Sequence, residues 1–184
     1  MIVAILISIH LLADFLFQTS AYSEKKRKKL KPLLLHCFIY FIVFEILLLP
    51  ILQFKKAFLL GMIISVLHFL INFIKNKLEK SFPQRRLQIW IFSINQLIHF
   101  ALLIGMNYIF NLENSVSNLY IKLQEYENFK IIILYIFVFS IIFEPASVFI
   151  RKLFTSISPK TSPKENLEEL KAGNIIGKLE RIII

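Results

Sequence analysis

The chain has 184 residues, of which 57% are hydrophobic and 18% are charged, and its mean hydropathy is +0.66. Soluble globular chains carry about 25% charged residues, so this composition excludes an ordinary water-soluble domain and favours a helical membrane protein. The single cysteine, Cys37, excludes an intramolecular disulfide, and the net charge of +10 has to be explained by where the basic residues lie.

Five apolar runs approach the length of about 20 residues that crosses the core of a bilayer as a helix. They are rich in Leu, Ile and Phe without strict alternation, which fits helices and argues against the strands of a barrel. The sequence therefore predicts an all-α polytopic transmembrane bundle of about five spans, placed in the cell membrane as a multi-pass protein. The runs comprise residues 2–18, 32–54, 56–75, 88–112 and 130–150.

The composition becomes polar after the last run, so we expect three segments. Residues 1–154 are expected to form the transmembrane bundle, and residues 155–173 a cytoplasmic linker with a short helix. That helix is predicted by a capping box, in which Glu165 follows three residues after Ser162. Residues 174–184 are expected to begin a further apolar helix that the chain leaves incomplete.

Basic residues are concentrated in alternate connections between the runs. The connection 25–31 carries six of them, the connection 75–86 carries five and the tail after residue 150 carries seven, whereas the other two connections hold four together. Cytoplasmic segments of membrane proteins are enriched in Lys and Arg. This distribution predicts an N-terminus outside the cell and a C-terminal tail in the cytoplasm.

The same distribution decides which partners are expected. A basic run beside a membrane span is typical of an orientation signal that contacts anionic lipid headgroups, so nucleic acid is not expected as a partner. The lipid bilayer is the expected partner, and the sequence leaves the oligomeric state open. The residues predicted to contact headgroups are Lys25, Lys26, Arg27, Lys28 and Lys29.

All four histidines fall inside apolar runs, with one in each of the first four. Three of them have a polar residue four positions away, on the same helical face. Such a spacing lets side chains converge on one point, as a metal site, a proton path or an interhelical hydrogen-bond network requires. The predicted pairs are His10 with Asp14, His68 with Asn72 and His99 with Asn95; His36 stands alone, and Gln18 and Gln96 extend the polar faces.

Counting along the predicted helices places these polar groups in one layer. Most lie about 5 to 13 Å from the predicted cytoplasmic side, and His99 lies about 16 Å from it. Glu144 falls at a similar depth, whereas Glu45 lies in the outer half and does not fit the layer. A carboxyl group inside a membrane is normally tolerated only where it faces the bundle interior or water, so Asp14 and Glu144 are expected to point inward.

Three functions are compatible with this predicted cluster, and the sequence alone does not decide whether the chain is an enzyme. The first is a metal-dependent membrane hydrolase acting on a lipid or its headgroup, with a divalent metal bound by His10, Asp14, His36 and His68. Its candidate catalytic residues are the same four and His99, with Gln18, Asn72, Asn95, Gln96 and Glu144 in support. The alternatives are a proton- or ion-linked transporter or channel component, and a structural membrane partner subunit without catalysis.

Several of these motifs together resemble a known family. They are HLLADFLFQ at residues 10–18, His36, HFLINFIKN from His68, NQLIH at residues 95–99 and GNIIGKLER at residues 173–181. In order and spacing they are similar to the bacterial family called domain of unknown function three-three-zero-seven. The resemblance implies a polytopic protein of the bacterial inner membrane and implies no particular reaction. The family pattern usually has Asp where this chain has Asn72 and Asn95, and amides are poor zinc ligands.

Overall fold

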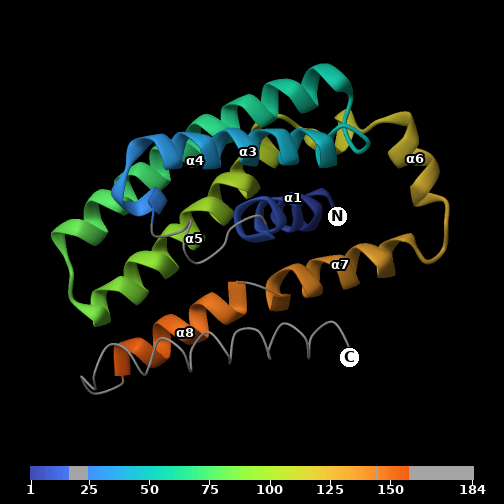
Figure 1. Cartoon of the computed structure of the whole chain (residues 1–184). Helices are drawn as coiled ribbons and strands as arrows, with labels where there is room; N and C mark the ends of the chain where they lie inside the picture. The colour runs from blue at the N-terminus through green and yellow to red at the C-terminus, as the bar shows by residue number, and fades with distance from the viewer. Residues whose placement is uncertain (17–24, 144, 158–184) are drawn as a thin grey trace.

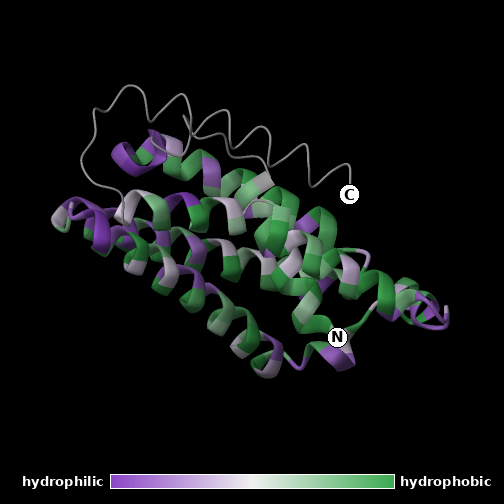
Figure 2. Cartoon of the chain, turned by 90° about the horizontal axis from the view of Figure 1, so that it is seen from below, coloured by the Kyte–Doolittle hydropathy of each residue, from purple (hydrophilic) through white to green (hydrophobic). Residues whose placement is uncertain are grey.

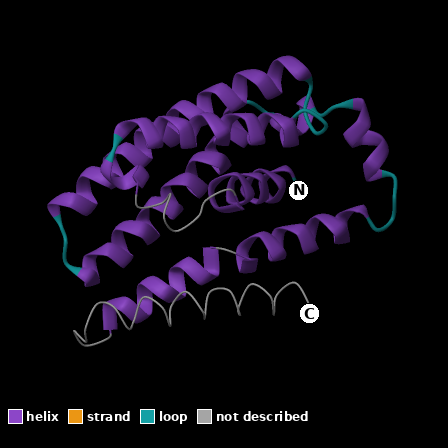
Figure 3. Cartoon of the chain, viewed as in Figure 1, coloured by secondary structure: helices purple, strands orange, loops and turns teal. Residues whose placement is uncertain are grey.

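The computed structural model describes residues 1–16, 25–143 and 145–157, and this part of the chain is helical almost throughout (Figure 3). It contains no strand, and an isolated bridge joins Leu52 to Val116. The all-α fold class predicted from the sequence is confirmed. The elements are α1 (Ile2–Leu11), the π-helix η1 (Leu12–Leu16), α3 (Leu30–Leu48), α4 (Phe54–Ser81), α5 (Arg85–Ile109), the 3₁₀-helix η2 (Leu112–Ser115), α6 (Asn118–Gln124), α7 (Phe129–Phe143) and α8 (Pro145–Ile157).

Within the described residues, four helical segments are long and apolar enough to cross a membrane. They are Leu30–Leu48, Phe54–Ser81, Arg85–Ile109 and Phe129–Ser156, and each has at least 19 residues. The first predicted span corresponds to the apolar helix Ile2–Phe15, which is shorter than the length of about 20 residues that a full crossing needs. Of the five predicted spans, four therefore have the length that a full crossing needs.

The short helix α1 lies in the middle of the bundle, where it packs against α3, α5 and α7 (Figure 1). Eight of its ten residues are apolar, and a helix of this composition belongs in a core. Ile2, Ile5, Leu6 and Ile9 are buried there, and they belong to the same apolar cluster as Tyr40 of α3. The first segment of the chain is thus enclosed by later ones.

The outer surface of the bundle remains strongly apolar. On α7, for example, Leu134 is 58% exposed and Tyr135 is 71% exposed, and Ser140 is the buried residue of that helix. Figure 2 shows hydrophobic residues along the middle of the bundle and hydrophilic residues gathered toward its ends. Apolar surface of this extent needs a hydrocarbon environment or a protein partner to cover it.

The two ends of the bundle differ in charge. Residues 25–31 lie at the same end as the connection between α4 and α5, and we call this the basic end (Figure 1). The turn between α3 and α4 lies at the opposite end, where Ser117 donates to the Pro50 carbonyl at 2.6 Å. The separation of charge along the bundle agrees with the pattern read from the sequence, and the orientation in a membrane remains a prediction.

Three sequence predictions concern residues outside the described part of the chain. These are the polar residues Gln18 and Glu144, and the C-terminal segments 155–173 and 174–184 beyond Ile157, which include the capping box at Ser162.

Candidate metal site

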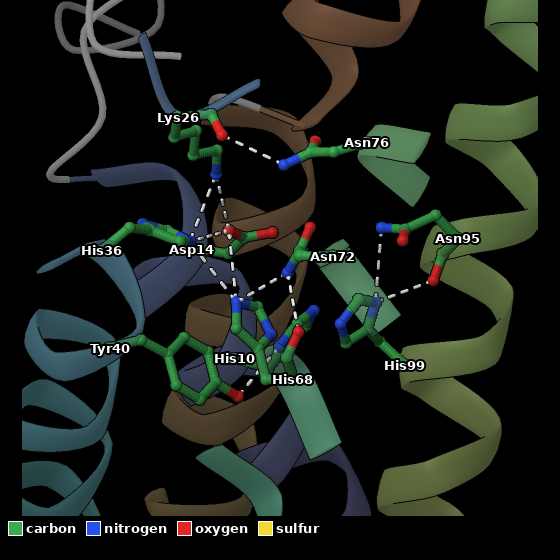
Figure 4. A network of polar contacts seen from close by, with 10 residues as sticks. All are labelled: His10, Asp14, Lys26, His36, Tyr40, His68, Asn72, Asn76, Asn95 and His99. Carbon is green, nitrogen blue, oxygen red and sulfur yellow. Dashed lines mark hydrogen bonds and ion pairs between the residues drawn. The ribbon is translucent and has the colours of Figure 1, made fainter. Parts of the chain in front are cut away.

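A buried polar cluster lies inside the bundle toward its basic end (Figure 4). Helix α1 contributes His10, and α3, α4 and α5 contribute His36, His68 and His99. All four imidazoles are buried, with exposed fractions between 0% and 4%. The four histidines that the sequence places in four separate apolar runs are thus gathered in one region.

Three of the predicted ligands come together as a compact set. Oδ1 of Asp14 lies 3.0 Å from Nε2 of His36 and 3.8 Å from Nε2 of His68. The two Nε2 atoms lie 3.3 Å from each other. One ligand atom from each of the three residues lies within 4.8 Å of the other two, and all three residues are buried.

Two of the three separations are close to those of ligands around a single metal ion. With zinc–nitrogen bonds of about 2.0 to 2.1 Å, two ligands in a tetrahedral arrangement lie about 3.3 Å apart. The His36–His68 distance of 3.3 Å matches that value, and the Asp14–His36 distance of 3.0 Å lies close to it. Two histidines and one carboxylate are also a ligand set that catalytic zinc and non-haem iron both use.

A single hydrogen bond accounts for only one of the three polar contacts of His36 Nε2. Its Nε2 atom has three polar neighbours, which are Asp14 at 3.0 Å, Lys26 at 3.1 Å and His68 at 3.3 Å. An imidazole nitrogen offers either one hydrogen or one lone pair, so it satisfies one such neighbour at a time. A shared cation would satisfy the oxygen and both imidazole nitrogens together.

Asp14 reaches the cluster from an irregular turn. It lies in η1, the π-helical continuation of α1, and its residue is 4% exposed. Single π turns inside helices occur frequently at functional sites, because they rotate side chains away from the positions of a regular helix. Here the carboxylate is directed toward His36 of α3 and His68 of α4, and His10 on the preceding turn has another partner.

Lys26 also belongs to the cluster, although its place in the basic run predicted a contact with lipid headgroups. Its ammonium lies 3.6 Å from Oδ1 of Asp14, its residue is 4% exposed, and Asn76 donates to its carbonyl at 3.0 Å. Burial lowers the pKa of this ammonium to about 8, and the neighbouring Asp14 carboxylate opposes that shift. The run of basic residues gives no signal that distinguishes the one lysine that turns inward.

The other half of the cluster contains no carboxylate. Nδ1 of His10 lies 3.0 Å from the Tyr40 hydroxyl, and the ring of His10 stacks on that of His99 with centroids 4.8 Å apart. Tyr40 in turn stacks on His68 at a centroid distance of 3.9 Å. His10 is thus beside the three-ligand set and is not part of it, although the sequence analysis proposed it as a fourth ligand.

Amide side chains border the histidines as their spacing predicted. Nδ2 of Asn72 lies 3.0 Å from Nε2 of His68, and Nδ2 of Asn95 lies 3.5 Å from Nδ1 of His99. The ring of His99 also donates from Nδ1 to the backbone carbonyl of Asn95 at 2.7 Å. The latter bond leaves Nε2 of His99 as an acceptor. Buried atoms of this region that make no hydrogen bond within the described part of the chain include Nδ1 of His68, Nε2 of His99 and Oδ1 of Asn95.

A second buried carboxylate lies farther along α3. Glu45 is 8% exposed, and neither of its oxygens has a hydrogen-bond partner among the residues that the structure describes. It packs against Gly61 of α4, where a Cβ atom would collide with the carboxylate. The nine residues between His36 and Glu45 correspond to about 13 Å along the helix, so Glu45 lies outside the polar cluster, as its position in the sequence predicted.

The fold and the cluster together define the class: in its described residues the protein is helical, with four segments long and apolar enough to span a membrane and a buried Asp/His/His group that could hold a metal ion. Residues 2–126 match the family described as Protein of unknown function (DUF3307), and the chain belongs to that family. The resemblance drawn from the sequence motifs is therefore confirmed. No curated protein and no solved structure matches the chain.

Proposed function

We propose that this chain is a membrane-embedded metal-dependent hydrolase whose divalent transition metal is bound by Asp14, His36 and His68. One observation carries the proposal: two imidazole nitrogens face each other at 3.3 Å with a carboxylate oxygen 3.0 Å from one of them. Three protein ligands leave a coordination position for water, and a catalytic metal lowers the pKa of that water to about 7.

The residues around the set have complementary roles in this proposal. Lys26 lies 3.1 Å from His36, where its ammonium would stabilise the negative charge that develops when water attacks an ester. Asn72 donates to the backbone carbonyl of His68 at 3.1 Å, which holds its amide beside the His68 ring. His36 lies six residues, or about 9 Å, from the start of α3 at the basic end, which favours a substrate bond in or near a lipid headgroup.

The first test measures metal bound per chain after purification in mild detergent and reconstitution with zinc, manganese or iron. We expect about one ion per wild-type chain and a loss of at least tenfold in affinity in His68→Gln. His99→Gln is the matched control, because His99 is a buried histidine on the neighbouring helix outside the three-ligand set. Absence of metal from the wild type, or an equal loss in both variants, would overturn the proposal.

The second test measures hydrolysis of phospholipid vesicles by the metal-loaded protein. Release of a water-soluble headgroup should depend on the metal, stop with a chelator and be lost in His68→Gln. A protein that binds metal and releases no headgroup from any of the common phospholipids would contradict the hydrolase assignment and leave a metal-binding membrane protein.

A second candidate, a proton path, is favoured by the continuity of the imidazoles. His36 lies 3.3 Å from His68, whose ring centroid lies 4.8 Å from that of His99, and His10 and Tyr40 extend the row. Buried histidines and carboxylates are the usual titrating groups of such paths. This candidate predicts proton flux in vesicles that is lost in His99→Gln, the variant expected to keep the metal.

A further inference from the structure

A small pocket opens at the basic end, next to the polar cluster. Its volume is about 230 Å³, and it is lined by Arg27, Lys28, Asn76, Glu79 and Lys80. The pocket therefore lies between the short helical stretch 25–28 and the last two turns of α4. Neither the metal set nor the imidazole row includes it.

The lining is positively charged in spite of its one carboxylate. Glu79 is buried and is paired with Arg27 at 2.7 Å and with Lys152 of α8 at 3.7 Å. Its charge is therefore compensated from two sides, while Lys28 and Lys80 are exposed at the rim. A ligand that enters this pocket meets two lysines and one arginine, and the complementary ligand is an anion.

The pocket is held in shape by contacts from α5. Gln88 accepts a hydrogen bond from the Arg27 guanidinium at 3.2 Å and donates to the carbonyls of Glu79 at 3.0 Å and Phe82 at 2.8 Å. These bonds tie the stretch 25–28 to α4 and α5 at one point. The Arg27 guanidinium is thus preorganised and loses less conformational freedom when a ligand binds.

The pocket lining is linked to the candidate metal site through the neighbouring residue Lys26 and one hydrogen bond. Lys26, whose ammonium lies 3.6 Å from Asp14, is the residue before Arg27. Asn76 lines the pocket and donates to the Lys26 carbonyl at 3.0 Å. A group bound by Arg27 and Lys28 would accordingly lie one residue along the chain from the lysine that contacts the metal ligands.

We propose that this pocket binds the phosphate of an anionic phospholipid headgroup. A volume of about 230 Å³ corresponds to about eight water molecules, enough for a phosphate and a small alcohol. Basic residues at the end of membrane-spanning helices face the layer in which such phosphates lie. The role of the pocket in presenting substrate rests on the proposed hydrolase function, whereas the binding itself does not.

Binding is tested with the full-length protein in neutral detergent micelles, by calorimetric titration with short-chain phosphatidylglycerol and, separately, with inorganic phosphate. Replacing both rim lysines, as Lys28→Gln with Lys80→Gln, should weaken phosphatidylglycerol binding by about 30-fold. The matched control is Lys29→Gln with Lys77→Gln, because both lysines are exposed neighbours with the same charge that do not line the pocket. We expect the control to bind within about threefold of the wild type.

Each outcome decides between sources of the phosphate. Tight phosphatidylglycerol binding that millimolar inorganic phosphate displaces weakly, and that the rim substitutions remove, supports a lipid ligand. Equal losses in both double variants would indicate diffuse surface attraction, and stronger binding of inorganic phosphate than of lipid would indicate a soluble ligand; either would overturn the proposal. The Asp14→Asn variant should bind phosphatidylglycerol normally, so a failed metal site and a failed pocket are distinguishable.

Discussion

Asp14 and Glu45 are two buried carboxylates in one helical bundle, and their surroundings differ completely. Asp14 has Lys26, His36 and His68 within 3.8 Å. Glu45 has no hydrogen-bond partner in the described part of the chain and lies against the backbone of Gly61. The first carboxylate belongs to a converging set of possible metal ligands, whereas the second fills the space that a glycine leaves.

Burial alone therefore does not identify a carboxylate as a candidate metal ligand. A charged group in an apolar interior costs free energy wherever it lies, and it is tolerated when cations or donors compensate it. Asp14 has that compensation from three directions, so it can serve chemistry. Glu45 lacks it, so its contribution to stability should be unfavourable, and the two residues should respond to substitution in opposite ways.

The largest expected effect is on metal binding. Asp14→Asn should lower the affinity for a divalent metal by about 100-fold, because the substitution removes the anionic ligand of the set. Glu45→Gln, an equally conservative change in a buried carboxylate, should leave the affinity unchanged. Competition with a metal-sensitive dye measures the metal affinity of each variant. A similar loss of affinity in the two variants would show that the two carboxylates do not differ in metal binding.

The next effect is on stability. Glu45→Met should raise the free energy of unfolding by about 1 to 3 kcal/mol, because a side chain of similar size replaces a buried group without a partner. The thermal midpoint in detergent, followed by circular dichroism, should increase accordingly. A lower midpoint would mean that the Glu45 carboxylate has a stabilising partner in the assembled protein.

A smaller effect is expected at Lys26. Lys26→Met should increase metal affinity by about tenfold, because it removes an ammonium that lies 3.1 Å from His36 and 3.6 Å from Asp14. Lys28→Met is the control, since Lys28 is exposed and not in contact with the ligands. A decrease in affinity would instead identify the amine of Lys26 as an additional ligand.

The smallest effect concerns the glycine beside Glu45. Gly61→Ala should lower the free energy of unfolding by about 1 kcal/mol, because the added methyl group displaces the Glu45 side chain. Gly105→Ala on α5 should raise it by about 0.5 to 1 kcal/mol, because its Cβ meets no atom within 4 Å and alanine favours the helix. Combining Gly61→Ala with Glu45→Ala should cancel the first effect, and a loss that persists would place the clash elsewhere.

The helical fold and the gathering of the histidines followed from properties that the sequence contains directly. Apolar length predicts helices, and antiparallel packing brings residues at equal depth to the same level. The pairings within the cluster depended on rotations that the sequence does not show. A π turn between His10 and Asp14 directs the second residue toward His36, while His10 meets Tyr40.

The contributions of Lys26 and Tyr40 could not be singled out for similar reasons. Tyr40 lies four residues after His36, at the spacing used for the other pairs, but it is one of many aromatic residues in apolar runs. Lys26 enters the bundle because the stretch 25–28 returns to it, and that path depends on tertiary contacts such as the bond from Asn76. Local pattern predicts depth and face, and it does not predict where a connection turns back.

The enclosure of α1 by α3, α5 and α7 has a consequence for the biosynthesis of the protein. Chains are made from the N-terminus at a few residues per second to a few tens, so α1 and Asp14 leave the ribosome before any of the three helices that enclose them. The first of these three helices, α3, ends at Leu48, and the last, α7, is complete only with Phe143. A nascent chain that stops before α7 leaves one side of its first helix uncovered, so the enclosure of α1 is completed only after α7 has been made.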